Sequence, residues 1–324
     1  MPEPAPLGEF ERIRRFYRPL ASRTPGALDL TDDAALLSPA PGHVLVVTAD
    51  ALIEDVHFRA ADPPDLVARK MLRVNLSDIA AMGARALGYV MTTALPRRCG
   101  EDWLERFAAG LAADQEEFSV GLFGGDSVAT PGPIALSLTA FGEVPLGQAI
   151  RRNGARPGDG VYVTGTVGDG ALGLLALDGR LPPGIGAADL AFLGDRYLLP
   201  RPRVAVGPVL RGVASAMLDV SDGLVADLGH IAETSGVGAE IERDRVPVSP
   251  AGRAALDRDP GLWSAVLGGG DDYELLFTAP GPVPETVAGV PVRQIGRVVA
   301  GAGVRVLDEQ GRSLSVAGAG YRHF

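Results

Sequence analysis

The chain has 324 residues, 46% of them hydrophobic and 22% charged, which is typical of a globular protein with one large or two medium domains. Acidic residues number 40 against 30 basic ones, and the net charge of −10 argues against a nucleic-acid partner or an anionic membrane surface. The single cysteine cannot form an internal disulfide, and we find neither the apolar core of a signal peptide nor the roughly 18 apolar residues of a membrane span. We therefore expect a cytoplasmic protein.

The first half of the chain alternates between strand-like and helical segments. The continuous apolar run VLVVT is typical of a buried strand, and it ends just before Asp50. A segment with helical spacing begins at Asp65 and stops at Gly83, where a helix C-cap is expected. Strands are expected over 44–48, 87–94, 120–123 and 134–144, and helices over 65–83 and 103–118. This half predicts one α/β domain, residues 1–148.

The turn-rich stretch RRNGARPGDG, which begins at Arg151, indicates the boundary to a second domain, residues 149–324. There we expect strands over 161–164, 216–220 and the run YELLFTA, and helices over 171–177 and after Gly223. The stretch 178–202 is broken by proline and glycine, so we expect a loop. The alternation in both halves predicts an α/β fold, with sheets covered by helices and strand-end loops gathered on one side.

Aspartates stand beside small residues at the predicted strand ends. They are Asp32, Asp33, Asp50, Asp126, Asp219, Asp222, Asp271 and Asp272. Any one of them alone is more often a helix cap or a turn residue. Asp78 is different because it shares a mostly apolar helix face with Met71, Asn75 and Met82, where an unpaired carboxylate would be costly. This aspartate calls for a cation.

Converging carboxylates repel one another unless a metal ion neutralises them. Oxygen ligands without a cysteine site favour Mg²⁺ or Ca²⁺ over zinc, and Mg²⁺ that carries nucleotide phosphates is the common use of such a site. The chain has no GxxxxGK[ST] motif and no HRD or DFG set, which excludes P-loop NTPases and protein kinases. The loop GTVGDG before a helix is suited to bind phosphate through its N–H groups, although an ordinary turn is the commoner explanation.

Several blocks of sequence, taken together, resemble the thiamine-monophosphate kinases in order and spacing. They are LTDDAALL, TADALIEDVHF, RKMLRVNLSDIAAMGA, LFGGDS, RRNGARPGDGVYVTG, LDVSDGLVADLGHI, GGGDDYELLFT and GYRHF. The resemblance runs from Gly8 to Phe324, which is almost the whole chain. The superfamily of these kinases also contains aminoimidazole ribonucleotide synthetase and selenophosphate synthetase.

The resemblance implies a two-domain α/β protein of the aminoimidazole ribonucleotide synthetase-like fold that dimerises through its N-terminal sheet. It also implies that ATP and several Mg²⁺ ions bind between the acidic loops, and that the γ-phosphoryl of ATP is transferred to thiamine monophosphate, giving thiamine diphosphate. The implied metal ligands are Asp33, Thr48, Asp50, Asp78, Asp126, Asp219 and Asp222. The implied contacts of ATP are Gly125, Asp126, Arg152 and Ser221, and those of thiamine monophosphate are His57, Asp271 and Tyr321. Asp126 and Asp222 are the catalytic candidates.

Three of these residues also have plainer explanations. His57 is equally suited to be a strand-end histidine bonded to backbone, and Tyr321 to anchor the C-terminal tail. Ser221 is placed to cap the helix that follows it, which is compatible with a contact to a nucleotide.

Three other functions remain open. A sister ATP-dependent enzyme would share the acidic loops, but the VHF and GYRHF elements favour the thiamine branch. A selenophosphate synthetase would need a reactive Cys-Lys pair near the N-terminus, which this sequence lacks. A nucleotide sensor that has lost phosphoryl transfer is suggested by three departures from the family pattern: Ala49 replaces a threonine, Ser127 begins an altered loop, and Asp271 replaces a glutamate.

Overall fold

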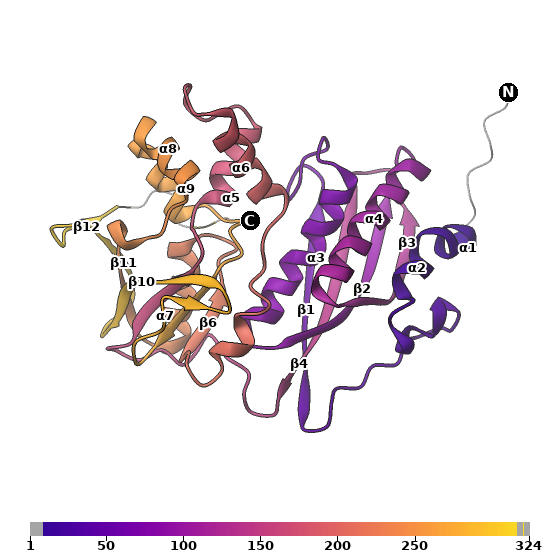
Figure 1. Cartoon of the computed structure of the whole chain (residues 1–324), viewed down its shortest axis with the longest axis horizontal. Helices are drawn as coiled ribbons and strands as arrows, with labels where there is room; N and C mark the ends of the chain where they lie inside the picture. Colours follow the sequence, from indigo (N-terminus) through magenta and orange to yellow (C-terminus); the bar gives the residue numbers. More distant parts are fainter. Residues whose placement is uncertain (1–8, 316–319, 321–324) are drawn as a thin grey trace. The chain divides into compact units, whose positions relative to one another are not determined.

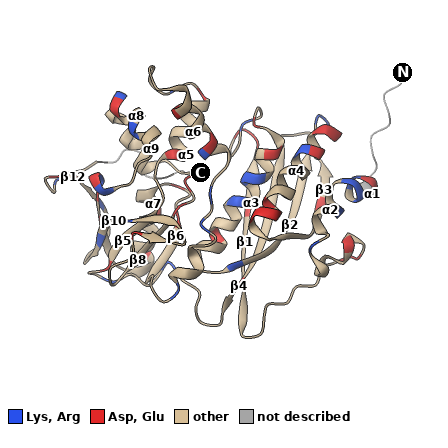
Figure 2. Ribbon diagram, viewed as in Figure 1, with Lys and Arg blue, Asp and Glu red and all other residues tan. Residues whose placement is uncertain are grey.

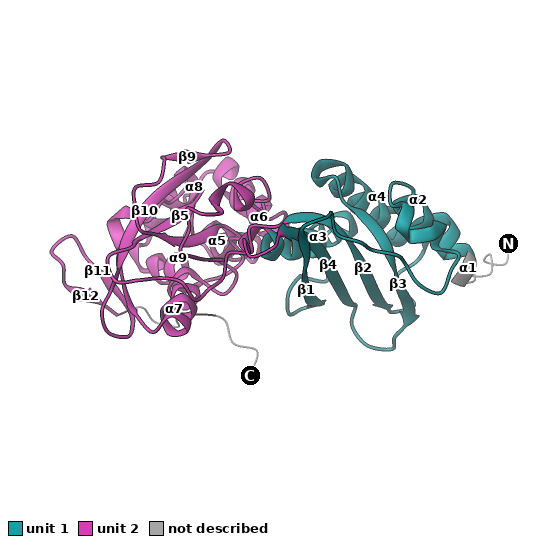
Figure 3. Cartoon of the chain, turned by 90° about the horizontal axis from the view of Figure 1, so that it is seen from below, with its two compact units in different colours: residues 1–79, 85–144 teal, residues 80–84, 145–324 magenta. Residues whose placement is uncertain are grey.

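The computed structural model describes residues 9–315 and residue 320 (Figure 1). The chain forms two compact units, one of residues 1–79 and 85–144 and the other of residues 80–84 and 145–324 (Figure 3). In this described part, no helix has both the length and the apolar character needed to cross a membrane. Figure 2 shows basic residues interleaved with acidic ones along the elements of both units.

Unit 1 is built on a four-stranded sheet in the order β1-β4-β2-β3. Its strands are β1 (His43–Ile53), β2 (Arg85–Leu95), β3 (Gly121–Ala129) and β4 (Ala135–Pro145). The helical segments are α1 (Glu9–Arg12), η1 (Ile13–Tyr17), α2 (Arg18–Ala21), η2 (Pro25–Leu30), α3 (Pro64–Ala81) and α4 (Glu101–Phe118). Helices α3 and α4 lie on the same side of the sheet (Figure 3).

The two faces of this sheet differ because side chains alternate along each strand. On β2, Tyr89 and Met91 are buried. On the edge strand β1, Leu45 and Val47 are 39% and 58% exposed, which is unusual for apolar side chains at the centre of a strand. The sheet therefore has one face packed in the core and one face with exposed apolar residues.

Unit 2 contains an eight-stranded sheet in the order β12-β11-β7-β10-β5-β8-β6, with β9 paired to β10. Its strands are β5 (Gly160–Thr164), β6 (Ala216–Asp219), β7 (Gly238–Glu242), β8 (Leu275–Ala279), β9 (Thr286–Val287), β10 (Val290–Val299), β11 (Gly303–Leu307) and β12 (Ser313–Leu314). Its α-helices are α5 (Asp169–Leu177), α6 (Ala187–Leu198), α7 (Leu224–Ser235), α8 (Pro250–Arg258) and α9 (Trp263–Gly268). Three short 3₁₀ turns are η3 (Gly207–Leu210), η4 (Arg243–Arg245) and η5 (Pro260–Leu262).

The sheet of unit 2 buries both of its faces. Val163 of β5 and Leu276 of β8 belong to a core with residues of α5, α7, α8 and α9. The neighbouring Tyr162 and Phe277 belong to a second core with Val206 and residues of η3. Because successive side chains of a strand point to opposite faces, these alternating memberships place the two cores on opposite sides of the sheet.

Most of the predicted elements are confirmed, with four differences. The VLVVT run was predicted to be a buried strand, but it begins the edge strand β1, where Leu45 and Val47 are exposed. The stretch 178–202, predicted to be a loop, contains α6, and its Gly194 and Tyr197 are buried in the packing. Strand β1 continues to Ile53 and β3 continues to Ala129, so Asp50 and Asp126 lie within strands and not after them. Gly124 and Gly125 suggested that β3 ends before Asp126. The strand continues because its pairing with β2 extends past Asp126 to Ala129.

A buried carboxylate joins β5 to the chain around α6. The Glu274 side chain is fully buried. It accepts hydrogen bonds from Thr164 Oγ1 at 2.6 Å, from Arg203 Nε at 2.6 Å and from Arg196 Nη2 at 3.2 Å. Removing one member of such a network leaves the others charged and buried, which costs more than the intact network contributes. This network therefore constrains the position of α6.

We predict that Glu274→Ala lowers the free energy of unfolding by about 3 kcal/mol, because partly buried Arg203 loses its carboxylate partner and buried Arg196 keeps only Asp169, at 3.9 Å. Urea denaturation followed by circular dichroism would measure it. The matched control is Asp195→Ala, which removes a surface pair with Arg201 whose side chains are about half exposed and should cost about 1 kcal/mol or less. Equal losses in the two variants would contradict the prediction.

Candidate functional site

Three of the predicted metal ligands lie together in unit 1. Thr48 and Asp50 are two residues apart on β1 and so share a face of that strand. The hydroxyl of Thr48 donates to Asp78 Oδ2 of α3 at 2.6 Å. The pKa of Asp50 is raised to about 6. Burial is the main cause, and the nearby charge of Asp78 contributes to the same shift. Asp78 thus has a polar partner, and the two carboxylates are close enough to repel each other.

A second group of predicted residues lines a cavity of about 760 Å³ beside β3. Asp33, Gly125 and Asp126 contribute to its wall. Gly125 has a φ of 155°, and a Cβ there would meet the Met91 carbonyl oxygen at 1.8 Å, so only glycine fits. Asp126 Oδ1 accepts the N–H of Ser127 at 2.7 Å. The cavity combines these carboxylates with an apolar wall.

The structure does not bring these two groups together within one chain. Strands β1 and β3 are the opposite edges of the four-stranded sheet. Neighbouring strands lie about 4.8 Å apart, so three steps separate the two edges by about 14 Å. The pair Asp50 and Asp78 is therefore distinct from the group formed by Asp33 and Asp126.

In unit 2 the structure brings Ser221 and Asp271 together. Strand β6 pairs with β8, and beyond their ends the Asp271 N–H donates to the Ser221 carbonyl at 3.0 Å and the Tyr273 N–H to the Val220 carbonyl at 2.8 Å. Asp271 and Tyr273 have left-handed φ values of 68° and 52°. Such conformations cost about 1–3 kcal/mol each in residues other than glycine, and they are found most often at functional sites.

Asp227 is a functional candidate that the sequence reasoning missed. Its Oδ2 accepts the backbone N–H groups of Ser221, Asp222 and Gly223 at 3.1, 3.1 and 3.0 Å. The prediction that Ser221 caps α7 is wrong, because the N-cap residue is Gly223 and no side chain caps it in the usual way. The sequence signal that could have identified Asp227 is its place in the first turn of the helix, at the end of SDGLVAD.

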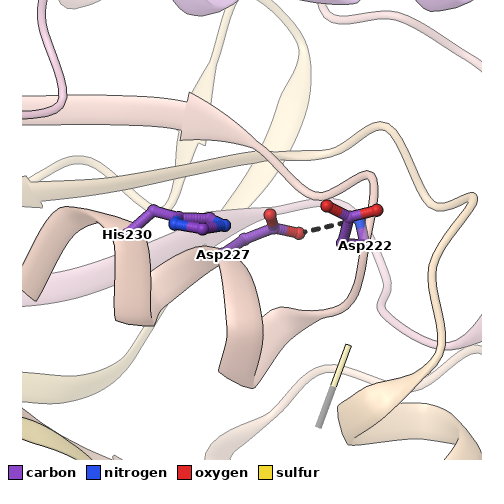
Figure 4. A group of neighbouring side chains, drawn as sticks. All are labelled: Asp222, Asp227 and His230. Carbon is purple, nitrogen blue, oxygen red and sulfur yellow. Dashed lines mark hydrogen bonds between the residues drawn. The ribbon is translucent and has the colours of Figure 1, made fainter. Parts of the chain in front are cut away.

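Three potential ligand atoms meet at this end of α7 (Figure 4). One atom from each of Asp222, Asp227 and His230 lies within 4.8 Å of the other two. Burial raises the pKa of Asp227 to about 7, while its three N–H partners lower it and the Asp222 charge raises it. The Asp227 carboxylate is therefore held by backbone dipoles in an environment that otherwise disfavours its charge.

The GTVGDG loop is held by a second buried carboxylate. Asp272 accepts the N–H groups of Gly168 at 2.7 Å and Gly170 at 3.0 Å. Burial raises the pKa of Asp272 well above its ordinary value, although these two hydrogen bonds oppose the shift. Two of the loop amides that the sequence predicted to bind phosphate, those of Gly168 and Gly170, are thus already bonded within the protein.

Asp219 is the last residue of β6 and is buried, two residues before Ser221. The His57 ring accepts the Ile53 N–H through Nδ1 at 3.0 Å, in the turn after β1. The Arg152 carbonyl accepts the hydroxyls of Thr234 and Ser235 at 3.1 and 3.2 Å, at the C-terminal end of α7, whereas Ser221 precedes its N-terminus. Tyr321 lies outside the described residues.

We predict that Asp50→Asn stabilises the metal-free protein at pH 7.5 by up to about 3 kcal/mol relative to the wild type. The folded-state pKa of about 6 lies above the unfolded value, so the wild type loses stability as the pH rises from about 4 through 6, and the asparagine does not. Urea denaturation in EDTA at pH 4.5 and 7.5 would test this.

The same experiment with Mg²⁺ should stabilise the wild type more than Asp50→Asn, because a divalent cation relieves the repulsion between the two carboxylates. Asp257→Asn, which changes an exposed carboxylate of α8, is the control and should alter stability little at either pH. If Asp50→Asn is no more stable than the wild type at pH 7.5 in EDTA, burial and the Asp78 charge do not disfavour ionised Asp50.

Two domain families match the chain. The family model for the AIR synthase related protein, N-terminal domain, matches residues 31–144, and that for the C-terminal domain matches residues 156–309. These matches define the class of the fold: two AIR synthase related domains in tandem.

Full-length relatives narrow this class further. The thiamine-monophosphate kinase of Caulobacter vibrioides is 44% identical over 99% of this chain and 92% of its own length. The crystal structure of the Stenotrophomonas maltophilia thiamine-monophosphate kinase is 41% identical over 91% of this chain and 96% of its own, with a TM-score of 0.79. AaThiL complexed with AMPPCP and TMP is 32% identical over 98% of this chain and 97% of its own, with a TM-score of 0.77. The chain belongs to the thiamine-monophosphate kinase family.

Proposed function

We propose that this protein transfers the γ-phosphoryl group of ATP to thiamine monophosphate, forming thiamine diphosphate and ADP. One observation carries the proposal: over almost its whole length the chain is similar to AaThiL, which was solved with AMPPCP and TMP bound. AMPPCP is an analogue of ATP that cannot transfer its γ-phosphoryl group, so that complex pairs a donor analogue with TMP.

Mg²⁺ fits the carboxylate groups of each unit. Asp50 and Asp78 are oxygen ligands whose mutual repulsion a divalent cation would relieve, and Thr48 adds a hydroxyl beside them. We propose that the metal ligands are these three residues with Asp33, Asp126, Asp219 and Asp222. When bound, Mg²⁺ supplies positive charge to the phosphates and aligns them.

Repulsion between two anions dominates the barrier of this reaction. Two unit charges about 4 Å apart repel by about 1 kcal/mol in water and about 4 kcal/mol at an effective dielectric constant of 20. The acceptor phosphate is already largely ionised at neutral pH, since its second pKa is about 6, and so it needs no general base. The work of the chain is to place donor and acceptor in line, with Gly125, Asp126, Arg152 and Ser221 as the proposed contacts of ATP.

The acceptor is proposed to contact Asp271, His57 and Tyr321. The carboxylate of Asp271 suits the positively charged ring of thiamine, and Tyr273 Oη donates to Asp271 Oδ1 at 3.3 Å. His57 Nδ1 accepts the Ile53 N–H, which places the hydrogen of a neutral ring on Nε2, a donor type that suits a phosphate oxygen.

We also propose a cytoplasmic homodimer. The exposed apolar side chains of β1, including Leu45 and Val47, lie on the sheet face away from the core, and they support dimerisation through this sheet. ATP as co-substrate supports the cytoplasmic location.

The direct test incubates the protein with Mg-ATP and either thiamine monophosphate or free thiamine, and then separates the products by chromatography. We expect one ADP for each thiamine diphosphate, formed from the monophosphate alone. Asp126→Asn should lower kcat/KM by about 100-fold or more, because it removes a carboxylate from the proposed metal site.

The control for this variant is Asp65→Asn, which changes a surface carboxylate that pairs with Arg106 and should leave turnover unchanged. A protein that binds Mg-ATP but forms no thiamine diphosphate would refute the kinase and favour the nucleotide sensor.

A further inference from the structure

Asp227 is bonded to the loop that the proposed function uses most in unit 2. The side chain is only 3% exposed, and a single oxygen of it accepts three consecutive amides, those of Ser221, Asp222 and Gly223. A carboxylate that accepts several backbone N–H groups forms strong, charge-assisted hydrogen bonds. Three consecutive amides converge on one atom only in a narrow range of backbone conformations.

The loop has little freedom to adopt another conformation. Gly223 has a φ of 129°, and a Cβ at this position would meet the Gly268 carbonyl carbon at 2.7 Å. On the other side the Ser221 carbonyl accepts the N–H of Asp271. Asp227 adds the third constraint, at the centre of the loop, and without it the three backbone donors around Asp222 would lose their acceptor.

We propose that Asp227 is a positioning residue for phosphoryl transfer, which rests on the proposed function: it holds the Ser221–Gly223 backbone so that Ser221 and Asp222 present their side chains to nucleotide and metal. Its Oδ2 accepts three amides, and we assign the residue to the loop and not to the metal on that basis, while the variants below test ligation through the other oxygen. Exposed His230 lies beside both carboxylates but makes none of these bonds.

The variants separate positioning from direct ligation. Asp227→Ala removes the acceptor, whereas Asp227→Asn keeps a carbonyl oxygen that can accept the amides but removes the anionic ligand. If Asp227→Ala does not fold, Asp227→Glu replaces it, because it keeps the charge and displaces the acceptor. The control is Asp308→Ala, since Asp308 also accepts two backbone amides, from Gln310 and Arg312, in a turn of the β11–β12 segment.

The first measurement is amide hydrogen exchange of residues 221–223 in the metal-free protein. Positioning predicts that protection is lost in Asp227→Ala, kept in Asp227→Asn and unchanged in Asp308→Ala. Protection that survives in Asp227→Ala would overturn the proposal without any assay of activity.

The second measurement is the Mg²⁺ dependence of AMPPCP binding, by calorimetry, and of turnover. We expect Asp227→Ala to raise the half-saturating Mg²⁺ concentration by about 10- to 100-fold, with the KM for thiamine monophosphate unchanged and most of the loss rescued in Asp227→Asn. If Asp227→Asn loses Mg²⁺ affinity as far as Asp227→Ala does, Asp227 is a ligand and the positioning role is refuted.

These outcomes keep the two proposals apart. A wild type that makes thiamine diphosphate while Asp227→Ala behaves like Asp308→Ala retains the function and refutes the role of Asp227. A wild type that binds Mg-AMPPCP but makes no thiamine diphosphate refutes the function, and Asp227 is then judged by exchange and binding alone. A wild type that binds no nucleotide refutes both.

Discussion

The structure around the candidate site depends on one constraint: the carboxylates that the fold buries or crowds together must be neutralised. An isolated carboxylate is costly to bury, so each one requires hydrogen-bond donors, a counter-ion or a metal. This chain uses different solutions in different places. Asp227 and Asp272 accept hydrogen bonds from backbone amides, and Glu274 accepts hydrogen bonds from two arginine side chains. Asp50 and Asp78 remain close enough for their charges to raise the pKa of Asp50.

The choice of partner separates structure from function. A carboxylate whose partners are amides or arginines fixes a loop or a helix, as Asp272 fixes the GTVGDG loop and Glu274 fixes the chain around α6. A pair of carboxylates that repel each other is stabilised by protonation or by a cation that joins them, and a cation suits a kinase that has no P-loop and many aspartates. Glycines are needed beside these carboxylates. At Gly125 and Gly223 the backbone lies so close to a neighbouring carbonyl group that a side chain would collide with it.

The α/β fold could be predicted from the sequence because apolar runs such as VLVVT and the helical spacing after Asp65 are strong local signals. The helix α6 could not be predicted, because the glycines and prolines around 178–202 resemble a loop. The contact with α5 explains one of the glycines, since a Cβ at Gly194 would meet Leu177 Cδ2 at 3.1 Å. The aspartates that form the acidic groups could be found as a pattern. Their division between opposite edges of the first sheet depends on strand order, which no local pattern contains.

The role of Asp227 shows a further limit. From the sequence it is one more acidic residue in the first turn of a helix, where a favourable interaction with the helix dipole is sufficient explanation. Its hydrogen bonds to three amides depend on the backbone conformation of the loop before α7, which the sequence pattern does not give. The same holds for Asp272, whose partners lie about a hundred residues earlier in the chain.

Anomalous diffraction from crystals soaked with Mn²⁺ and AMPPCP would show whether divalent cations join the carboxylates that the fold crowds together. Mn²⁺ accepts the same oxygen ligands as Mg²⁺ and is visible at its absorption edge. We predict anomalous peaks at Asp50 and Asp78 and at Asp222, and none at Asp272 or Glu274, whose partners are already supplied by the protein. Crystals with bound AMPPCP but no peak at Asp50 and Asp78 would contradict the account.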